Sequence, residues 1–553
     1  MKKTIKKYYI LLLLAVSIIS CDKMLDVDSE RVVFDDQYNM TATNDSLFSM
    51  FGVFTQLQKI ADSYVLLGEL RGELMDVRDE SNLYLKEINN FEVSPENPYA
   101  SNVKDFYSIV NNCNYIIKNI PNAKIENESK IVAAAKAVRA WTYMQIALNY
   151  GDAYYYTEPI LSVNEAEQVQ AGTPMKFNNL AAILISELLP LKDVEFPRLQ
   201  VVFSHNFNNS FFPVRYILGD LYLWTGQYEK AAQEYKDLIY LNNYTISNNR
   251  YRTLREASNQ AFTGGIIFQS GGWHSLFGTG STEYITNIGT TNQYGHKFHL
   301  DSMVWRAEVV SSKVAVENWN KQNYVESASL DTLGDLRRIG SVSSRIATSS
   351  SANNDGYLVL YDSLRTNYLA KYLIMNPITE NQRTNKRIII YRVAQLYLRY
   401  AEAINRAGKP NMAFAVMKNG LNALTMANKK IIPLHEVDTV NIPNYLDFGD
   451  QRFDNNIGTK MRGAGRLNVD TTHYIIPNLP TLQDSILWVE DKIVEELALE
   501  TAFEGNRFQD LMRVALRRND NAYLADKVAS KHTVNKDAIR SKLMNQENWY
   551  IKK

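Results

Sequence analysis

Residues 391–424 contain the pattern that most restricts the fold of this chain. One apolar stripe in this stretch recurs at helical spacing and consists of Val393, Tyr397, Tyr400 and Ile404. It predicts a helix with one buried face. Gly408 follows, where a helix end favours a residue that tolerates positive φ. Pro410 then suits the first turn of a second helix, because its missing N–H would be unpaired there in any case. The stretch therefore predicts two antiparallel helices joined by a tight turn.

The second helix of this hairpin should pack closely against other parts of the chain. Its inner side is predicted to carry Ala413, Val416, Met417 and Leu424. Gly420 lies on the same side, where the lack of a Cβ would let a neighbouring backbone approach. A single hairpin cannot bury its own apolar stripe, so we expect further hairpins to pack with this one.

Three other segments have the pattern of a helix pair. In residues 221–240 the small and large residues fall where tetratricopeptide (TPR) repeats place them, and they are Leu223, Gly226, Tyr228, Ala231, Ala232 and Tyr235. We predict a mostly α fold: a TPR-like scaffold of about four helix pairs, near 103–150, 211–241, 388–427 and 484–518. Long loop-rich insertions with a few short strands interrupt the scaffold, within a single domain over residues 45–553.

The first 21 residues predict export and lipid attachment. Lys2, Lys3, Lys6 and Lys7 form a basic region, and an apolar stretch too short to span a membrane follows. Ile18-Ile19-Ser20-Cys21 then resembles a bacterial lipobox, which predicts a signal peptide over residues 1–20 and an acylated Cys21 at the start of a tether over 21–44. Several acyl chains anchor a protein stably in a membrane. An ordinary signal peptide with an incidental cysteine is the alternative.

Composition restricts the kinds of partner and of cross-link. Lys and Arg number 60, as do Asp and Glu, and this balance argues against nucleic acid as a ligand. If Cys21 is acylated, Cys113 has no intramolecular partner, so we expect no disulfide and a buried, inert thiol. The chain has 34 tyrosines, which suits both core packing and an aromatic recognition surface.

Two charged motifs are interpreted as structural. Glu69, Arg71, Glu73 and Asp76 close a predicted helix over residues 45–76 and are spaced for local ion pairs on a solvated or capped end. Residues 504–513 alternate in sign at i, i+3 spacing, which predicts an ion ladder along one helix face. Its members are Glu504, Arg507, Asp510 and Arg513.

The segment 484–513 resembles the C-terminal signature of the SusD/RagB family of outer-membrane lipoproteins. Its matching residues are Glu496, Glu500, Phe503-Glu504-Gly505, Arg507, Asp510-Leu511 and Arg513. The family pattern usually begins Glu-Arg, whereas this chain has Glu496-Leu497, which puts one ion pair in doubt. The resemblance extends to the Cys21 region and to segments 69–76, 139–151, 221–240 and 397–408, so it covers nearly the whole chain in the family's order.

The resemblance implies a nutrient-binding role without catalysis. SusD-like proteins are lipid-anchored on the cell surface and cover the mouth of a SusC-like TonB-dependent outer-membrane transporter. They bind an oligosaccharide, or in some members a peptide. We therefore expect a glycan-binding lipoprotein that delivers oligosaccharides to such a transporter, and a peptide-binding lipoprotein is the alternative. A glycan-cleaving enzyme and a pure TPR protein-interaction scaffold stay open as less favoured readings.

Two loop-rich segments carry the predicted ligand-binding residues. Sugars stack their C–H faces on aromatic rings and offer hydroxyls to planar polar groups, so exposed Trp or Tyr beside Asn indicates such a site. The insertion 264–362 contributes Trp273, Tyr284, Tyr294, Trp305 and Trp319, of which Trp273, Tyr294 and Trp319 are foremost. The loop 77–102 contributes Tyr84, Asn89, Asn90 and Tyr99. The family resemblance implies that these two regions face the ligand. Each ring could instead pack under its own loop.

Motifs of enzymes and metal sites are not evident. The seven histidines are scattered, and His296 with His299 lacks the further ligands of a familiar metal site. The sequence has no glycine-rich phosphate loop and no Gly-x-Ser-x-Gly motif. We therefore expect no catalytic residues, no metal and no cofactor.

Overall fold

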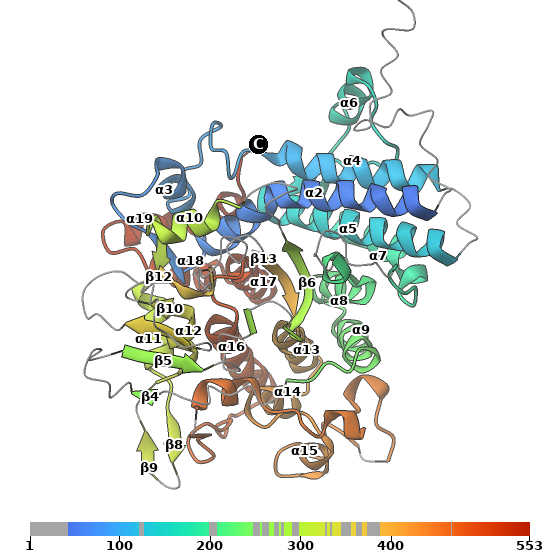
Figure 1. Ribbon diagram of the computed structural model, residues 1–553. Coiled ribbons are helices and arrows are strands. Elements are labelled where there is room, and N and C mark those ends of the chain that lie inside the picture. Colours follow the sequence, from blue (N-terminus) through green and yellow to red (C-terminus); the bar gives the residue numbers. More distant parts are fainter. Residues whose placement is uncertain are drawn as a thin grey trace, which may run out of the picture.

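The computed structural model describes most of the chain as a helical scaffold with short strands on one side (Figure 1). The described residues are 43–120, 126–197, 207–246, 255–256, 265–269, 276–277, 281–289, 298–326, 329–331, 334–343, 356–360, 368–372, 387–438, 440–465 and 467–552. The lipobox region and much of the insertion 264–362 lie outside them. Among these residues no helix is both long and apolar enough to cross a membrane.

Helix pairs form the scaffold, as the sequence predicts. The four predicted pairs are α4 (Val103–Asn119) with α5 (Glu126–Tyr150), α8 (Val214–Trp224) with α9 (Tyr228–Leu241), α13 (Val393–Arg406) with α14 (Pro410–Lys418), and α16 (Leu482–Glu500) with α17 (Arg507–Arg518). The remaining helices are α2 (Thr43–Glu69), α3 (Leu83–Asn89), α6 (Val163–Gln170), α7 (Phe177–Leu188), α10 (Leu300–Trp305), α11 (Lys313–Asn320), α12 (Arg337–Ser341), α15 (Ala423–Ala427), α18 (Asn521–Ala529) and α19 (Lys536–Leu543). The mostly α, TPR-like fold class is confirmed.

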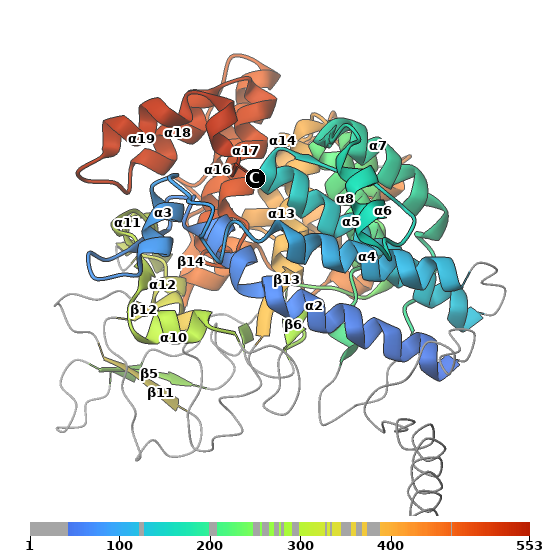
Figure 2. The ribbon, with the colours of Figure 1, turned by 90° about the horizontal axis from the view of Figure 1, so that it is seen from above.

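The strands are short, and every pairing is antiparallel. The two-stranded sheets are β1 (Met75–Val77) with β7 (Val309–Ser311), β2 (Asp152–Ala153) with β3 (Met175–Lys176), β6 (Tyr284–Gly289) with β13 (Arg387–Arg392), and β10 (Val342–Ser343) with β12 (Tyr368–Leu369). The three-stranded sheets are β4 (Arg255–Glu256), β5 (Gly265–Gln269) and β11 (Gly356–Leu360), and β8 (Tyr324–Glu326), β9 (Ser329–Asp331) and β14 (Asn468–Val469). Most strands gather on the side opposite α4, α5 and α7 (Figure 2).

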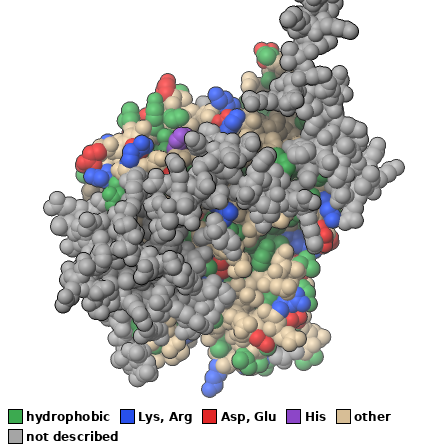
Figure 3. Space-filling model, in the orientation of Figure 1, with side chains coloured by type: hydrophobic (Ala, Val, Ile, Leu, Met, Phe, Trp, Pro, Cys, Tyr) green, Lys and Arg blue, Asp and Glu red, His purple; other side chains and the backbone are tan. Residues whose placement is uncertain are grey.

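Charges of both signs share the described surface. On the face drawn in Figure 3, basic and acidic side chains alternate instead of gathering by sign. This distribution agrees with the balanced composition of the whole chain.

The central hairpin has the predicted turn chemistry. Gly408 has φ +85° and Pro410 opens α14. Gly420 has φ +80°, and a Cβ there would lie 2.5 Å from the backbone oxygen of Asn456. The prediction for Leu424 is wrong: α14 ends at Lys418 and the Leu424 side chain is 84% exposed. The Gly420 turn breaks the helical period, so Leu424 belongs to the short helix α15 and faces away.

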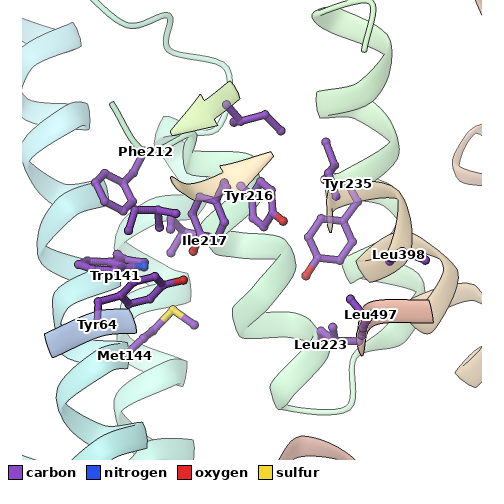
Figure 4. Close-up of a cluster of buried hydrophobic side chains, with 14 of the residues drawn as sticks. Tyr64, Trp141, Met144, Phe212, Tyr216, Ile217, Leu223, Tyr235, Leu398 and Leu497 are labelled. Carbon is purple, nitrogen blue, oxygen red and sulfur yellow. The ribbon is translucent and has the colours of Figure 1, made fainter. Parts of the chain in front are cut away.

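The core runs between the helix pairs as one aromatic-rich cluster. Tyr64 of α2 and Trp141 and Met144 of α5 face Phe212, Tyr216 and Ile217 at the start of α8 (Figure 4). The ring centroids of Trp141 and Phe212 lie 4.8 Å apart. Those of Tyr216 and Tyr391 lie 3.8 Å apart and are stacked. Such pairs add to the free energy gained by burying their apolar area, so the cluster joins α2, α5, α8 and β13, which are distant in sequence.

The charged end of α2 is buried, which corrects the prediction of a solvated helix end. Glu69, Arg71 and Glu73 are all at most 3% exposed. Arg71 donates to the backbone oxygen of Trp549 at 2.9 Å, and Glu73 pairs with Arg507. The partners lie more than 400 residues away, so spacing within the motif could not reveal them.

The predicted ion ladder forms only at its last step. Asp510 and Arg513 pair at 2.9 Å along α17. Glu504 precedes the helix and pairs instead with Lys371 and Arg392, at 2.6 and 2.7 Å. The other two steps of the ladder are therefore wrong, because each charge finds a partner on another segment. The reading of these residues as structural is consistent with their burial.

A second buried cluster, made of charged residues, joins the insertion 264–362 to α16. Glu500 accepts hydrogen bonds from Arg337, Arg392 and Arg462 at 2.7 to 2.8 Å. Glu496 pairs with Arg337 at 2.7 Å, while Leu497 is buried in the core. These three arginines come from three segments around the insertions, and burying them unpaired would be costly. The cluster thus holds the ends of the irregular segments in place.

Candidate ligand-binding face

Strand pairing brings the two predicted ligand-facing segments together. β1, which follows the first long helix, pairs with β7 of the insertion, so that Met75 lies opposite Ser311. Ser312 Oγ donates to the backbone oxygen of Glu73 at 2.6 Å. Ser81 Oγ donates to the backbone oxygen of Glu308 at 2.7 Å. As a result α3 and α10 lie on the same side of the molecule (Figures 1 and 2).

The segment 77–102 is more ordered than its loop-like composition predicts. It contains α3, whose N-terminus is capped by the Asn82 side chain accepting from Tyr84 N. The Glu87 carboxylate accepts from Ser94 N at 3.0 Å and from Asn97 Nδ2 at 2.9 Å. Asn97 Nδ2 also donates to the Tyr84 backbone oxygen. These hydrogen bonds hold Tyr84 and Tyr99 in fixed positions on one short segment.

Tyr84 and Tyr99 are half-buried, with part of each side chain open to solvent. Burial raises the pKa of the Tyr99 phenol, and the carboxylates of Asp62 and Glu308 raise it further against the opposing charge of Arg306. The phenol therefore keeps its proton and can donate a hydrogen bond. Rings of this kind offer an apolar face and a polar edge to a ligand.

Asn89 and Asn90 serve the structure of this segment. Asn89 is buried; its Nδ2 donates to Asp76 Oδ1 at 3.2 Å and its Oδ1 accepts from Lys531 Nζ at 2.6 Å. Asn90 ends α3, and its backbone oxygen accepts from Lys542 Nζ at 3.4 Å. The expectation that Asn89 is an exposed sugar ligand is therefore wrong, because both ends of its amide are already bonded inside the protein.

Trp319 does not belong to an exposed cradle. Its side chain is 0% exposed, its Nε1 donates to the backbone oxygen of Leu499 at 3.1 Å, and its ring lies 6.0 Å from that of Phe503. α11 places it against α16 because Ala315 and Trp319 share one helix face. The predicted exposure of Trp319 is wrong, and the alternative of a core ring is correct.

Of the other rings predicted to bind ligand, one is buried in the core, and the side chains of the rest lie outside the described part of the chain. Tyr284 is 6% exposed in β6, where the guanidinium of Arg387 lies 5.9 Å from its ring centroid, so its predicted exposure is also wrong. Trp305 ends α10, beside the face formed with α3, and its side chain is outside the described part. Trp273 and Tyr294 lie outside the described residues.

Two charged residues of this face carry no signal in the sequence. Arg306 and Glu308 occupy the turn between α10 and β7 and pair at 3.2 Å. Ala307 between them has φ +55°, so the turn is tight. Their charges shift the pKa of the Tyr99 phenol, which shows that they lie near it, and no local pattern could have found them. This surface, which we call the α3–α10 face, thus offers the rings of Tyr84 and Tyr99, the guanidinium of Arg306 and the carboxylate of Glu308.

The described residues offer no group of three or more His, Cys, Asp or Glu side chains that could hold a metal ion. Cys113 is buried, and burial raises the pKa of its thiol to about 12. A thiol with a raised pKa is a poor nucleophile at neutral pH.

No family model matches this chain, but two curated proteins are similar to it over most of its length. SusD-like protein P2 of Formosa agariphila is 24% identical over 462 residues, which are 81% of this chain and 78% of that protein. SusD-like protein P38 of the same organism is 23% identical over 76% of this chain and 82% of its own length.

A solved structure shares the fold. A SusD-like carbohydrate-binding protein from Bacteroides fragilis superposes with a TM-score of 0.54 at 14% identity, over 88% of each chain. At that identity the likeness concerns the fold alone, and it agrees with the helix pairs described above. The chain is thus similar to SusD-like proteins over about three quarters of its length or more, and it shares the fold of this solved structure.

Proposed function

We propose that this protein captures oligosaccharides at the bacterial cell surface and delivers them to a SusC-like TonB-dependent transporter in the outer membrane. The observation that carries the proposal is the β1–β7 pairing. It joins the segment 77–102, which carries the half-buried rings of Tyr84 and Tyr99, to the insertion, and Tyr99 lies near the charged turn of Arg306 and Glu308. The solved relative named as a carbohydrate-binding protein supports the same ligand class.

The chemistry of this face suits a sugar. A pyranose ring packs its C–H groups on an aromatic face, and its hydroxyls both donate and accept hydrogen bonds. Tyr84 and Tyr99 supply rings, while Arg306 supplies donors and Glu308 supplies acceptors. The hydrogen bonds of Glu87 and Asn97 fix the segment before the ligand arrives, which lowers the entropic cost of binding.

The rest of the proposal concerns the lipid anchor of the protein and its contact with the transporter. Acylation of Cys21 would tether it to the outer membrane. The TPR-like pairs then supply surface for contact with the transporter, while the segments around α3 and α10 hold the ligand. We assign no catalytic residue, because the role of the face is to bind and release.

Calorimetric titration with a panel of oligosaccharides tests this function. Wild type is compared with Tyr84→Ala and Tyr99→Ala. Tyr240→Ala serves as the control, since Tyr240 is an exposed tyrosine of α9. A parallel titration with short peptides distinguishes a glycan from a peptide as the ligand.

A further inference from the structure

A pocket lies on the scaffold, away from the face that α3 and α10 form. Its volume is about 780 Å³, and it opens between α4, the segment 154–160 and α6. α6 lies over α4 at the edge of the molecule (Figure 1), and none of its residues is buried. Pockets of 300 to 1,000 Å³ are the usual size for small-molecule ligands, so this one can hold a ligand of a few sugar rings.

The wall of the pocket is rigid. Asn111 on α4 holds the segment 154–160 with both ends of its amide, at 2.6 Å to Ile160 N and 2.9 Å to the Ile160 backbone oxygen. Tyr154 N donates to Tyr107 Oη at 2.8 Å. The rings of Tyr107 and Tyr156 are stacked, with centroids 6.3 Å apart. These contacts fix the aromatic part of the wall before any ligand binds.

The lining is aromatic, amide-rich and free of carboxylates. Its rings are Tyr107, Tyr154 and Tyr156, its neutral polar side chains are Gln56, Ser108, Asn111, Asn112 and Gln170, and its apolar side chains are Val103, Ile160, Ala166 and Val169. Lys104 is the one charged side chain in this lining. Amides and phenols both donate and accept, as sugar hydroxyls do, and the rings and aliphatic groups suit the C–H faces of a pyranose.

Two polar groups of the pocket lining, one on Gln56 and one on Tyr107, are available to a ligand. Gln56 Oε1 is buried without a hydrogen-bond donor. A buried acceptor without a donor costs free energy, which a ligand hydroxyl would recover. Tyr107 Oη accepts from Tyr154 N, and burial raises the pKa of this phenol to about 12. It therefore keeps a proton to donate. One acceptor and one donor in the same lining match the hydroxyls of a sugar ring.

We propose that this pocket is a second carbohydrate subsite, which binds a neutral oligosaccharide independently of the α3–α10 face. The proposal rests on the proposed function only in taking the ligand to be a saccharide. Two separated subsites on one protein would hold a long glycan at two points, and linked binding events raise the overall affinity above that of either site.

The test uses the full chain and saturation-transfer difference NMR with maltotriose, cellotriose, xylotriose and short galactans as probes. Val169→Trp fills the pocket from α6, which has no buried residue, so the fold should survive. Gln56→Leu removes the unpartnered amide at similar size. Gln168→Trp is the matched control, because Gln168 is exposed on the same helix and does not line the pocket.

We expect at least one probe whose signal falls tenfold or more in Val169→Trp and Gln56→Leu, and which is unchanged in Gln168→Trp, Tyr84→Ala and Tyr99→Ala. If every probe signal persists in Val169→Trp, or no probe binds wild type, the second subsite is ruled out. Loss of all binding in Tyr84→Ala and Tyr99→Ala, with none lost in Val169→Trp, would leave the proposed function standing and this inference refuted. The proposal would also be overturned if a tripeptide probe bound wild type and lost its signal in Val169→Trp, while no saccharide probe did so.

Discussion

Glu69 and Gly505 are joined by a 2.8 Å hydrogen bond from Gly505 N to Glu69 Oε1, although 436 residues separate them in the chain. Glu69 also accepts from the backbone N–H groups of Phe503 and Asn506, at 3.0 and 3.1 Å. The end of α2 therefore packs directly against the turn that precedes α17. Burial raises the pKa of the Glu69 carboxyl to about 7 in spite of these donors. The N- and C-terminal parts of the domain meet at this contact.

Gly68→Ala should destabilise the protein strongly. A Cβ at residue 68 would lie 1.8 Å from the backbone oxygen of Gly505, so α2 would have to move away from the turn. We expect a loss of at least about 3 kcal/mol in the free energy of unfolding, measured by urea denaturation. Gly52→Ala is the control, because nothing lies within 4 Å of its added Cβ, and it should be neutral or slightly stabilising. Equal stability of the two variants would contradict the close packing of α2 against the turn at Gly505.

Ala232→Trp tests the packing of the second helix pair. Ala232 is fully buried on α9, and at Gly219 of the partner helix α8 a Cβ would lie only 2.4 Å from Tyr235 Cε1. The two helices are therefore in close contact, and overpacking should cost about 1–3 kcal/mol or more. Lys230→Trp, at an exposed position of the same helix, should leave the melting temperature nearly unchanged. An unchanged melting temperature in Ala232→Trp would show that α8 and α9 do not pack this way.

Glu402 should contribute stability that is lost in acid. Burial opposes its charge, but Arg406 and Arg513 outweigh burial and lower the pKa of its carboxyl to about 2. The folded state therefore holds the proton less tightly than the unfolded chain, whose carboxyl has the ordinary pKa of 4.5. This contribution is complete above pH 4.5 and disappears as the pH falls toward 2, by on the order of 3 kcal/mol.

Glu402→Gln provides the comparison for that pH dependence. At pH 7 the variant should be less stable than wild type, because Arg406 and Arg513 lose a buried partner. The difference in unfolding free energy should shrink between pH 4.5 and pH 2, where the wild-type carboxyl takes up its proton. A difference that stays constant from pH 7 to pH 2 would mean that Glu402 has an ordinary pKa in the folded protein.

Cys21→Ala tests the anchor. We expect this variant to remain an unlipidated precursor or to appear as soluble protein, because the acylated thiol is the proposed membrane attachment. The measurement is fractionation together with incorporation of labelled palmitate. Cys113→Ala is the matched control. Cys113 is buried in α4 and should carry no acyl chain, so this variant should be labelled and should fractionate like wild type. Outer-membrane fractionation and palmitate label in Cys21→Ala would refute the lipobox interpretation.

Local signals in the sequence located the helix pairs but not their charged contacts. Gly408 and Pro410 mark a turn by their own backbone preferences, so the hairpin around them could be predicted. Glu69 and Glu504 find their partners on segments far away in the chain. Their spacing within a motif therefore indicated local pairs that the folded protein does not form.

The two segments predicted to face the ligand meet in the fold, but several residues predicted to be exposed in them are buried. Aromatic content and the family resemblance pointed to segments 77–102 and 264–362, and the β1–β7 pairing brings parts of them together. Whether one ring is exposed depends on the face of a short helix, which composition does not define. Trp319 is buried for this reason, while Tyr84 and Tyr99 stay partly open.

The central claim, glycan capture on the α3–α10 face, is tested most directly by titrating the oligosaccharide panel calorimetrically into wild type, Tyr84→Ala, Tyr99→Ala and the Tyr240→Ala control. The account predicts that one oligosaccharide binds wild type and the control alike. Each of the two other variants should then bind it more weakly by about 1 kcal/mol, which is about fivefold in Kd. Unchanged affinity in both Tyr84→Ala and Tyr99→Ala, or binding of peptides and of no oligosaccharide, would contradict the account.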